Sequence, residues 1–162
     1  MNVFDFAMQM ERDGKTHYEK LAAGTPIMGL KNIFGMLAAD EQKHFETIEA
    51  MKSGGKNDSM PGSTALDEAR NVFQGLMNDR ELLGGLNKDL DGYRYAMKIE
   101  ADSVKLYEDM AKKENRANIV QLLLKIANEE KKHYNIMENL YDFVLAPQNF
   151  LAWGEFSNLK EF

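Results

Sequence analysis

Two short stretches, Glu41-Gln-Lys-His44 and Glu130-Lys-Lys-His133, decide how the chain is expected to fold. Each stretch places a carboxylate and an imidazole three residues apart, which puts both side chains on one face of a helix. The two stretches lie 89 residues apart. The same offset relates three further pairs: Glu11 and Glu100, Asp13 and Asp102, and Tyr18 and Tyr107. The sequence therefore predicts an internal duplication of a helical hairpin, in which each copy supplies one solitary Glu and one Glu-x-x-His.

Four segments carry apolar residues at alternating steps of three and four, the pattern of an amphipathic helix. The pattern predicts helices over about residues 2–24, 26–52, 92–113 and 116–145. Gly24-Thr25-Pro26 supplies a stop and a restart between the first two helices. The solitary Glu residues and the Glu-x-x-His pairs lie on the apolar stripes of these helices, where core residues are expected.

The segment between the hairpins, about residues 53–91, is rich in Gly, Ser, Pro and Asn, which mark turns and loops. A structureless loop of this length is uncommon in a compact domain. We therefore expect a crossover that runs the length of a helical bundle, with a short helix over 66–77 capped near Ser63 or Thr64.

The predicted architecture is all-α: a four-helix bundle over residues 1–146, built from hairpins at about 2–52 and 92–145. An aromatic tail follows over 147–162 and contains the single tryptophan, Trp153. We expect this tail either to cover the apolar surface of a neighbour, which would give a homodimer, or to fold back on its own bundle.

The polar residues on the stripes are expected to meet. In each hairpin the solitary Glu and the Glu-x-x-His lie about 15 residues on either side of the turn, or about 20 Å from the hairpin end at about 1.5 Å per residue. Two hairpins around a pseudo-twofold axis would thus gather four carboxylates and two imidazoles in the core. Without a counter-charge these carboxylates would repel one another and lose solvation. The sequence therefore predicts two divalent metal ions, and ligation by oxygen and nitrogen suits iron or manganese and leaves zinc open.

Composition excludes several other classes of site and partner. The chain has no cysteine, so it can form neither a disulfide, a thiolate zinc site nor an iron–sulfur centre. The net charge of −6 and the scattered basic residues offer no surface for nucleic acid. No apolar run approaches the ~20 residues that cross a membrane, and the N-terminus lacks the pattern of a secretory signal. We expect a cytoplasmic protein without a membrane partner.

The spacing and the duplication resemble those of the rubrerythrin-like branch of the ferritin-like superfamily, over about residues 2–145 apart from the crossover. The resemblance implies a ferritin-like di-iron bundle. Its implied metal ligands are Glu11 and Glu100 as terminal ligands, Glu41 and Glu130 as bridges, and His44 and His133 on one metal each. It also implies that Tyr18 and Tyr107 donate hydrogen bonds to these ligands.

Two departures from that family bear on function. The lack of cysteine means that the chain cannot form a rubredoxin domain. Ser103 and Val104 stand one turn after Glu100, where rubrerythrin has an extra carboxylate that moves with redox state. The resemblance implies an oxidoreductase that acts in oxidative stress. It would reduce peroxide or dioxygen with electrons from a separate, rubredoxin-like donor. An iron-binding, ferroxidase or storage protein is the alternative, and a metal-stabilised bundle without turnover is a third possibility.

Three further features concern the surroundings of the site. Asp13 and Asp102 follow the solitary Glu residues by two positions and are expected at the surface, and His17 is expected to be solvated. Gly14, whose repeat partner is Ser103, costs about 1 kcal/mol relative to Ala inside a helix. Either close helix packing or an open pocket for the oxidant beside the metals would explain it.

Overall fold

The computed structural model describes residues 2–54, 59–77 and 89–145, and these residues form helices without strands. The helices are α1 (Val3–Gly24), α2 (Met28–Lys52), α3 (Ala65–Met77), α5 (Leu90–Lys113) and α6 (Ala117–Leu145). The predicted all-α class and the four long helices are thereby confirmed. The aromatic tail, and with it the expected dimer contact, lies outside the described residues.

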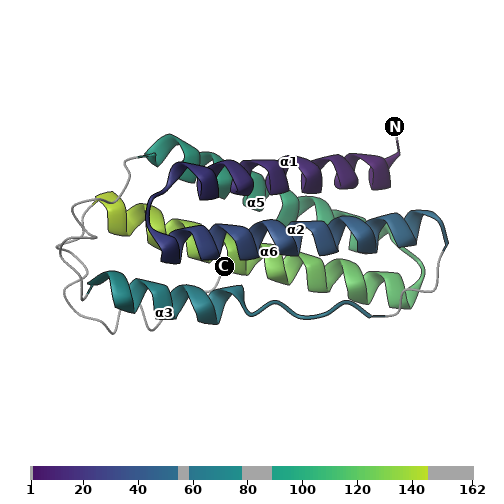
Figure 1. Cartoon of the computed structure of the whole chain (residues 1–162). Helices are drawn as coiled ribbons and strands as arrows, with labels where there is room; N and C mark the ends of the chain where they lie inside the picture. Colours follow the sequence, from purple (N-terminus) through teal and green to yellow (C-terminus); the bar gives the residue numbers. More distant parts are fainter. Residues whose placement is uncertain (1, 55–58, 78–88, 146–162) are drawn as a thin grey trace.

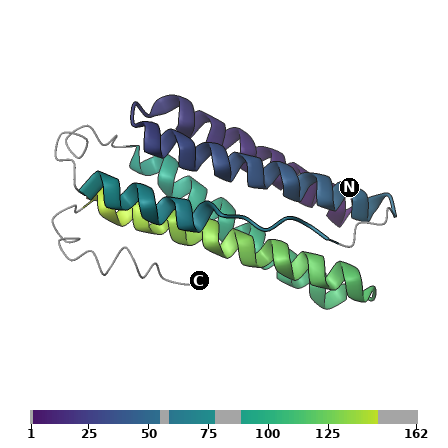
Figure 2. The same ribbon diagram turned by 60° about the horizontal axis from the view of Figure 1, so that its bottom comes forward.

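The long helices form two antiparallel hairpins, α1 with α2 and α5 with α6, which lie side by side as a ferritin-like bundle (Figure 1). The crossover follows the bundle lengthwise, and its helix α3 contacts α2 and α6 (Figure 2). The predicted crossover helix is thus confirmed, and the structure adds which face of the bundle it covers. The face formed by α1 and α5 lies on the other side.

Local chemistry sets the helix ends. The side chain of Asn2 accepts a hydrogen bond from the backbone N–H of Asp5 at 2.9 Å, and that of Asp89 accepts one from Gly92 at 3.0 Å, so both caps satisfy a free donor of the first turn. Helix α2 begins two residues later than expected, because Ile27 is still extended and serves as its N-cap.

Two apolar clusters fill the bundle, one on each side of a polar middle. One cluster includes Tyr18, Phe34 and Phe143, and the other includes Ile48, Tyr107 and Leu123. On each long helix, the Glu and His residues of the predicted site fall between the two clusters. The packing therefore holds six ionisable side chains in a layer that water does not reach.

Among the described helices, none combines the length and the apolar character that crossing a bilayer requires.

Candidate metal centre

The six residues predicted from the sequence lie together in the polar layer, and each is at most 1% exposed. They are Glu11, Glu41, His44, Glu100, Glu130 and His133, referred to below as the six-residue cluster. Their donor atoms form two groups, within each of which all atoms lie within 4.8 Å of one another: Glu11, Glu41, His44 and Glu130, and Glu41, Glu100, Glu130 and His133. Glu41 and Glu130 belong to both groups. The arrangement offers two adjoining four-ligand positions with two shared carboxylates.

The Nδ1 atoms of both histidines face carboxylate oxygens. His44 Nδ1 lies 3.1 Å from Glu130 Oε1 and 3.4 Å from Glu11 Oε1. His133 Nδ1 lies 3.0 Å from Glu41 Oε1 and 3.3 Å from Glu130 Oε1. The two imidazole rings are stacked, with their centroids 6.0 Å apart. Donors from all four long helices thus converge on one small volume.

The donor atoms of the cluster fit a pair of cations. Most of them are buried without a hydrogen-bond partner among the described residues: Glu11 Oε1, both Glu41 oxygens, His44 Nδ1, Glu100 Oε2, both Glu130 oxygens and His133 Nδ1. Buried polar atoms normally have partners, because leaving them without one costs free energy. Carboxylate oxygen and imidazole nitrogen are donors that first-row divalent metals accept. The unpartnered atoms are those that a dinuclear metal site would use.

Without metal, the cluster holds protons. Burial and the carboxylates of Glu100, Glu11 and Glu130 raise the pKa of Glu41 well above its usual range. Burial and Glu130 raise the pKa of Glu100 to about 8. Burial alone would lower the pKa of His44, but Glu11 and Glu130 outweigh it and raise that pKa well above 6.5. Metal binding therefore has to displace protons from these side chains.

Two tyrosines tie the hairpins together at the cluster. The Tyr18 hydroxyl on α1 donates a hydrogen bond to Glu100 Oε1 on α5 at 2.8 Å. The Tyr107 hydroxyl on α5 donates to Glu11 Oε2 on α1 at 2.7 Å. Each bond leaves the other oxygen of its Glu without a partner among the described residues. Burial and Glu100 raise the pKa of Tyr18 well above 10, so its hydroxyl keeps the proton that it donates.

Two carboxylates that the sequence analysis did not single out hold the outer nitrogens of the histidines. His133 Nε2 donates a hydrogen bond to Asp40 Oδ2 at 2.9 Å, and His44 Nε2 donates to Glu129 Oε1 at 2.8 Å. Each carboxylate belongs to the opposite hairpin from its histidine. With Nε2–H engaged in this way, Nδ1 is the nitrogen left to bind a metal. The sequence did carry a signal, because Asp40 and Glu129 obey the 89-residue offset and directly precede the shared carboxylates.

Gly14 has a packing role. A Cβ atom added at Gly14 would lie 2.7 Å from Glu41 Oε2, so the Glu41 carboxylate occupies the space that a side chain would need. The structure therefore favours close packing over an open pocket. Glu41 is also one of the two shared carboxylates, which links this glycine to the cluster.

A Gly14→Ala variant should weaken metal binding without weakening the fold. Its Cβ would displace the Glu41 carboxylate, so we expect a loss of metal affinity of about tenfold. The free energy of unfolding of the metal-free protein should stay equal or rise by up to about 1 kcal/mol, because Ala favours helix. Calorimetric metal titration and urea unfolding measure the two effects.

Gly35→Ala is the matched control for this variant, because a Cβ at Gly35 on α2 would meet no described atom within 4 Å. That variant should bind metal as the unmodified protein does. An unchanged metal affinity in Gly14→Ala would contradict the role assigned to the glycine.

The structure also places the remaining side chains around the site. Asp13 and Asp102 are exposed, as expected. The expectation for His17 was wrong: the ring is half-buried, its Nε2 lies 2.7 Å from the carbonyl oxygen of Gly92, and it packs edge-on against Tyr95 with centroids 4.8 Å apart. The reason is that α1 lies against the start of α5, a contact between hairpins that the stripe of one helix does not reveal.

Comparison with known proteins identifies the family. The family model described as Rubrerythrin matches residues 2–141. The chain belongs to the rubrerythrin family. Comparisons with curated proteins and with solved structures gave no match. The resemblance inferred from spacing is therefore confirmed, and the buried carboxylate and histidine groups of this rubrerythrin-family chain fit the dinuclear metal site that its family implies.

Proposed function

We propose that this protein is a cytoplasmic di-iron oxidoreductase that reduces peroxide, or dioxygen, with electrons from a separate donor. The observation that carries the proposal is the pair of adjoining four-ligand groups that share Glu41 and Glu130. In this proposal Glu11 and His44 complete one metal position, and Glu100 and His133 complete the other. Iron is preferred because the oxygen and nitrogen donors accept it and because the chemistry requires a metal that changes oxidation state.

The chain's own residues orient the donors and exclude water. Two ferrous ions, when bound, supply the two electrons that convert hydrogen peroxide and two protons into two water molecules. Tyr18 and Tyr107 hold one oxygen of Glu100 and of Glu11, which leaves the second oxygen of each free to bind metal. Asp40 and Glu129 hold the two imidazoles with Nδ1 inward. The apolar clusters on both sides keep bulk water from the reacting atoms.

The electrons have to come from outside this chain. Because the chain contains no cysteine, it cannot build the cysteine-ligated iron centre of a rubredoxin. We propose a separate rubredoxin-like protein as the donor.

Rapid mixing of the anaerobic, iron-loaded protein with peroxide and with dioxygen tests the proposal. We expect at least one of the two to oxidise the bound iron about 100-fold faster than it oxidises free ferrous iron at the same concentration, because the buried ligands hold two electrons at one place. Absorbance after stopped-flow mixing measures the rate. The zinc-loaded protein is the control and should not react. Oxidation no faster than that of free iron would leave metal binding with a structural role only.

The storage alternative uses the same ligands but needs a hollow shell of many subunits. A mass measurement by size-exclusion chromatography with light scattering separates the two functions, because a homodimer could not enclose a mineral core.

A further inference from the structure

The crossover is fastened to the bundle at the level of the cluster. Residues 59–64, which precede α3, run as an extended segment beside α2 and α6 (Figures 1 and 2). Met60 in this segment is buried at 3% exposure, and Lys125 of α6 donates a hydrogen bond to its backbone oxygen. The segment is therefore held in place before it reaches Ser63.

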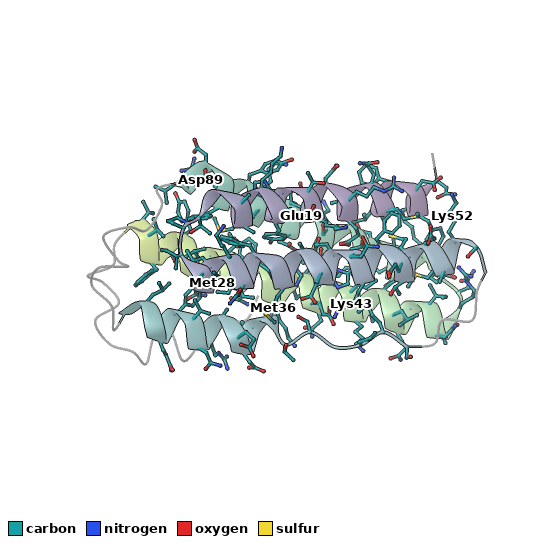
Figure 3. All side chains as sticks on the ribbon, in the orientation of Figure 1. Glu19, Met28, Met36, Lys43, Lys52 and Asp89 are labelled. Carbon is teal, nitrogen blue, oxygen red and sulfur yellow. The ribbon has the colours of Figure 1, made fainter. Side chains whose placement is uncertain are left out.

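Ser63 connects the crossover to a histidine of the cluster through one carboxylate. Its hydroxyl donates a hydrogen bond to Asp40 Oδ2. The same oxygen accepts the hydrogen bond from His133 Nε2 at 2.9 Å. The other oxygen, Asp40 Oδ1, lies 3.2 Å from the ammonium group of Lys43, which stands on the side of α2 that faces the crossover (Figure 3). Both oxygens of Asp40 are thus engaged, and the carboxylate has little freedom to turn.

Among the described residues, nothing gives this support to the equivalent carboxylate of the other half. Glu129 Oε1 accepts the hydrogen bond from His44 Nε2 at 2.8 Å. Glu129 Oε2 is buried and has no hydrogen-bond partner among the described residues. Its side chain is also one methylene longer than that of Asp40. The duplicated halves therefore differ in how firmly they hold their histidines, although their donor atoms are the same.

We propose that the crossover, through Ser63 and Asp40, positions the His133 imidazole, so that the metal position of Glu100 and His133 fills before that of Glu11 and His44. The inference rests on the proposed metal ligands. A carboxylate that fixes the outer nitrogen of a metal-binding histidine sets the ring orientation, and such partners typically change metal affinity 10- to 100-fold. Since coupling between two sites is reciprocal, an ion at the His133 position also holds the crossover in place.

Variants that keep one metal position allow the effect to be located. Glu11→Gln leaves the His133 position intact, and Glu100→Gln leaves the His44 position intact. We expect Ser63→Ala to weaken Co²⁺ binding about tenfold in the Glu11→Gln protein and to leave it unchanged in the Glu100→Gln protein. Anaerobic calorimetric titration of the full chain with Co²⁺ measures both affinities. Equal weakening in the two backgrounds, or none in either, would overturn the proposal.

Two controls separate the contact from general damage to the crossover. The backbone N–H of Ala65 also donates to the Ser63 hydroxyl, so Ser63→Ala loses a turn contact as well. Thr64→Ala alters the exposed neighbouring hydroxyl and should leave Co²⁺ affinity unchanged. Adding Ser63→Ala to Asp40→Asn should cause no further loss, because both changes break one chain of contacts. Additive losses would overturn the proposal.

Hydrogen exchange tests the reciprocal effect without a titration. Co²⁺ should slow amide exchange over residues 59–64 in the unmodified protein and should not do so in Asp40→Asn. If the unmodified protein binds no Co²⁺, both this inference and the proposed function are wrong. If the unmodified protein binds two Co²⁺ ions and Ser63→Ala changes the affinity for neither ion, only the inference is wrong.

Discussion

The metal-free protein should become less stable as the pH rises from about 5 to about 8, and two equivalents of divalent metal should remove this loss. Burial and Glu130 raise the pKa of Glu100 from 4.5 to about 8 in the folded protein. Between these values the folded protein binds a proton that the unfolded chain has released. The free energy of unfolding therefore falls with rising pH across this interval.

The other members of the six-residue cluster reinforce this trend. Burial raises the pKa of Glu11 and of Glu41, and surrounding carboxylates raise it further, so their contributions have the same sign. The pKa values of His44 and His133 lie well above 6.5, because Glu11 and Glu100 respectively, with further neighbours, outweigh burial. The stability that these imidazoles contribute is present below pH 6.5 and is lost as the pH rises toward their folded pKa values.

Groups with lowered pKa values act outside this interval. Burial would raise the pKa of Asp40, but His133, Ser63 and Lys43 outweigh it and hold that pKa at about 2. The stabilisation that Asp40 contributes is present above its ordinary pKa of 3.8 and is lost only as the pH falls toward about 2. Glu130, whose pKa is also lowered, behaves in the same way. From about pH 5 upward, the groups whose pKa values are raised decide how the free energy of unfolding changes with pH.

We expect the loss to be on the order of a few kcal/mol, since each pKa unit corresponds to about 1.4 kcal/mol. Metal at about 1,000 times its dissociation constant should add about 4 kcal/mol per site. Urea unfolding followed by far-UV circular dichroism measures both effects. Glu100→Gln should flatten the pH dependence, whereas the exposed control Asp102→Asn should leave it unchanged. A metal-free protein whose stability is flat or rises over this interval would contradict the assigned electrostatics.

Replacing a carboxylate that both four-ligand groups share should abolish more metal binding than replacing a carboxylate that belongs to one group. Glu130 belongs to both four-ligand groups, and its Oε1 lies 3.1 Å from His44 Nδ1 and 3.3 Å from His133 Nδ1. Glu11 belongs to one group only. Glu130→Gln should therefore weaken both metal positions, whereas Glu11→Gln should leave one ion tightly bound.

The expected loss of metal affinity is on the order of 100-fold or more at each affected position, since even partners that only support a ligand cost 10- to 100-fold. Oxidation of iron by peroxide should slow by a similar factor in both variants, because neither variant holds the pair of metal ions. Equilibrium dialysis with elemental analysis gives the metal content, and stopped-flow mixing gives the rate. Glutamine keeps the shape of the side chain, and Asp13→Asn, an exposed change two residues after Glu11, is the control. Equal metal loss in Glu130→Gln and Glu11→Gln would contradict the assignment of Glu130 to both metal positions and of Glu11 to one.

The sequence predicted the long helices and the six residues of the cluster because one repeat offset and one helical period fix them. Glu11 and Glu100 lie at equivalent positions on the apolar stripes of matching helices, so packing the two hairpins about a pseudo-twofold axis brings them to the same level. Asp40 and Glu129, which accept hydrogen bonds from the two histidines of the cluster, obey the same offset, yet this role did not follow from the pattern. Each of these residues meets a histidine of the opposite hairpin, and the packing between hairpins decides that contact.

What the sequence alone determined is thus the helical hairpin, its duplication and the set of donor atoms that the duplication gathers. Only the tertiary structure decided how those donors are held. Tyr18 and Tyr107 each donate a hydrogen bond to a Glu of the opposite hairpin. The Glu41 carboxylate fills the space beside Gly14, and Ser63 of the crossover donates a hydrogen bond to Asp40. The physical reason is how far apart in the sequence the interacting residues lie. Helical periodicity is set by neighbours three and four residues apart, whereas these contacts join side chains far apart in the chain whose meeting depends on how the helices pack.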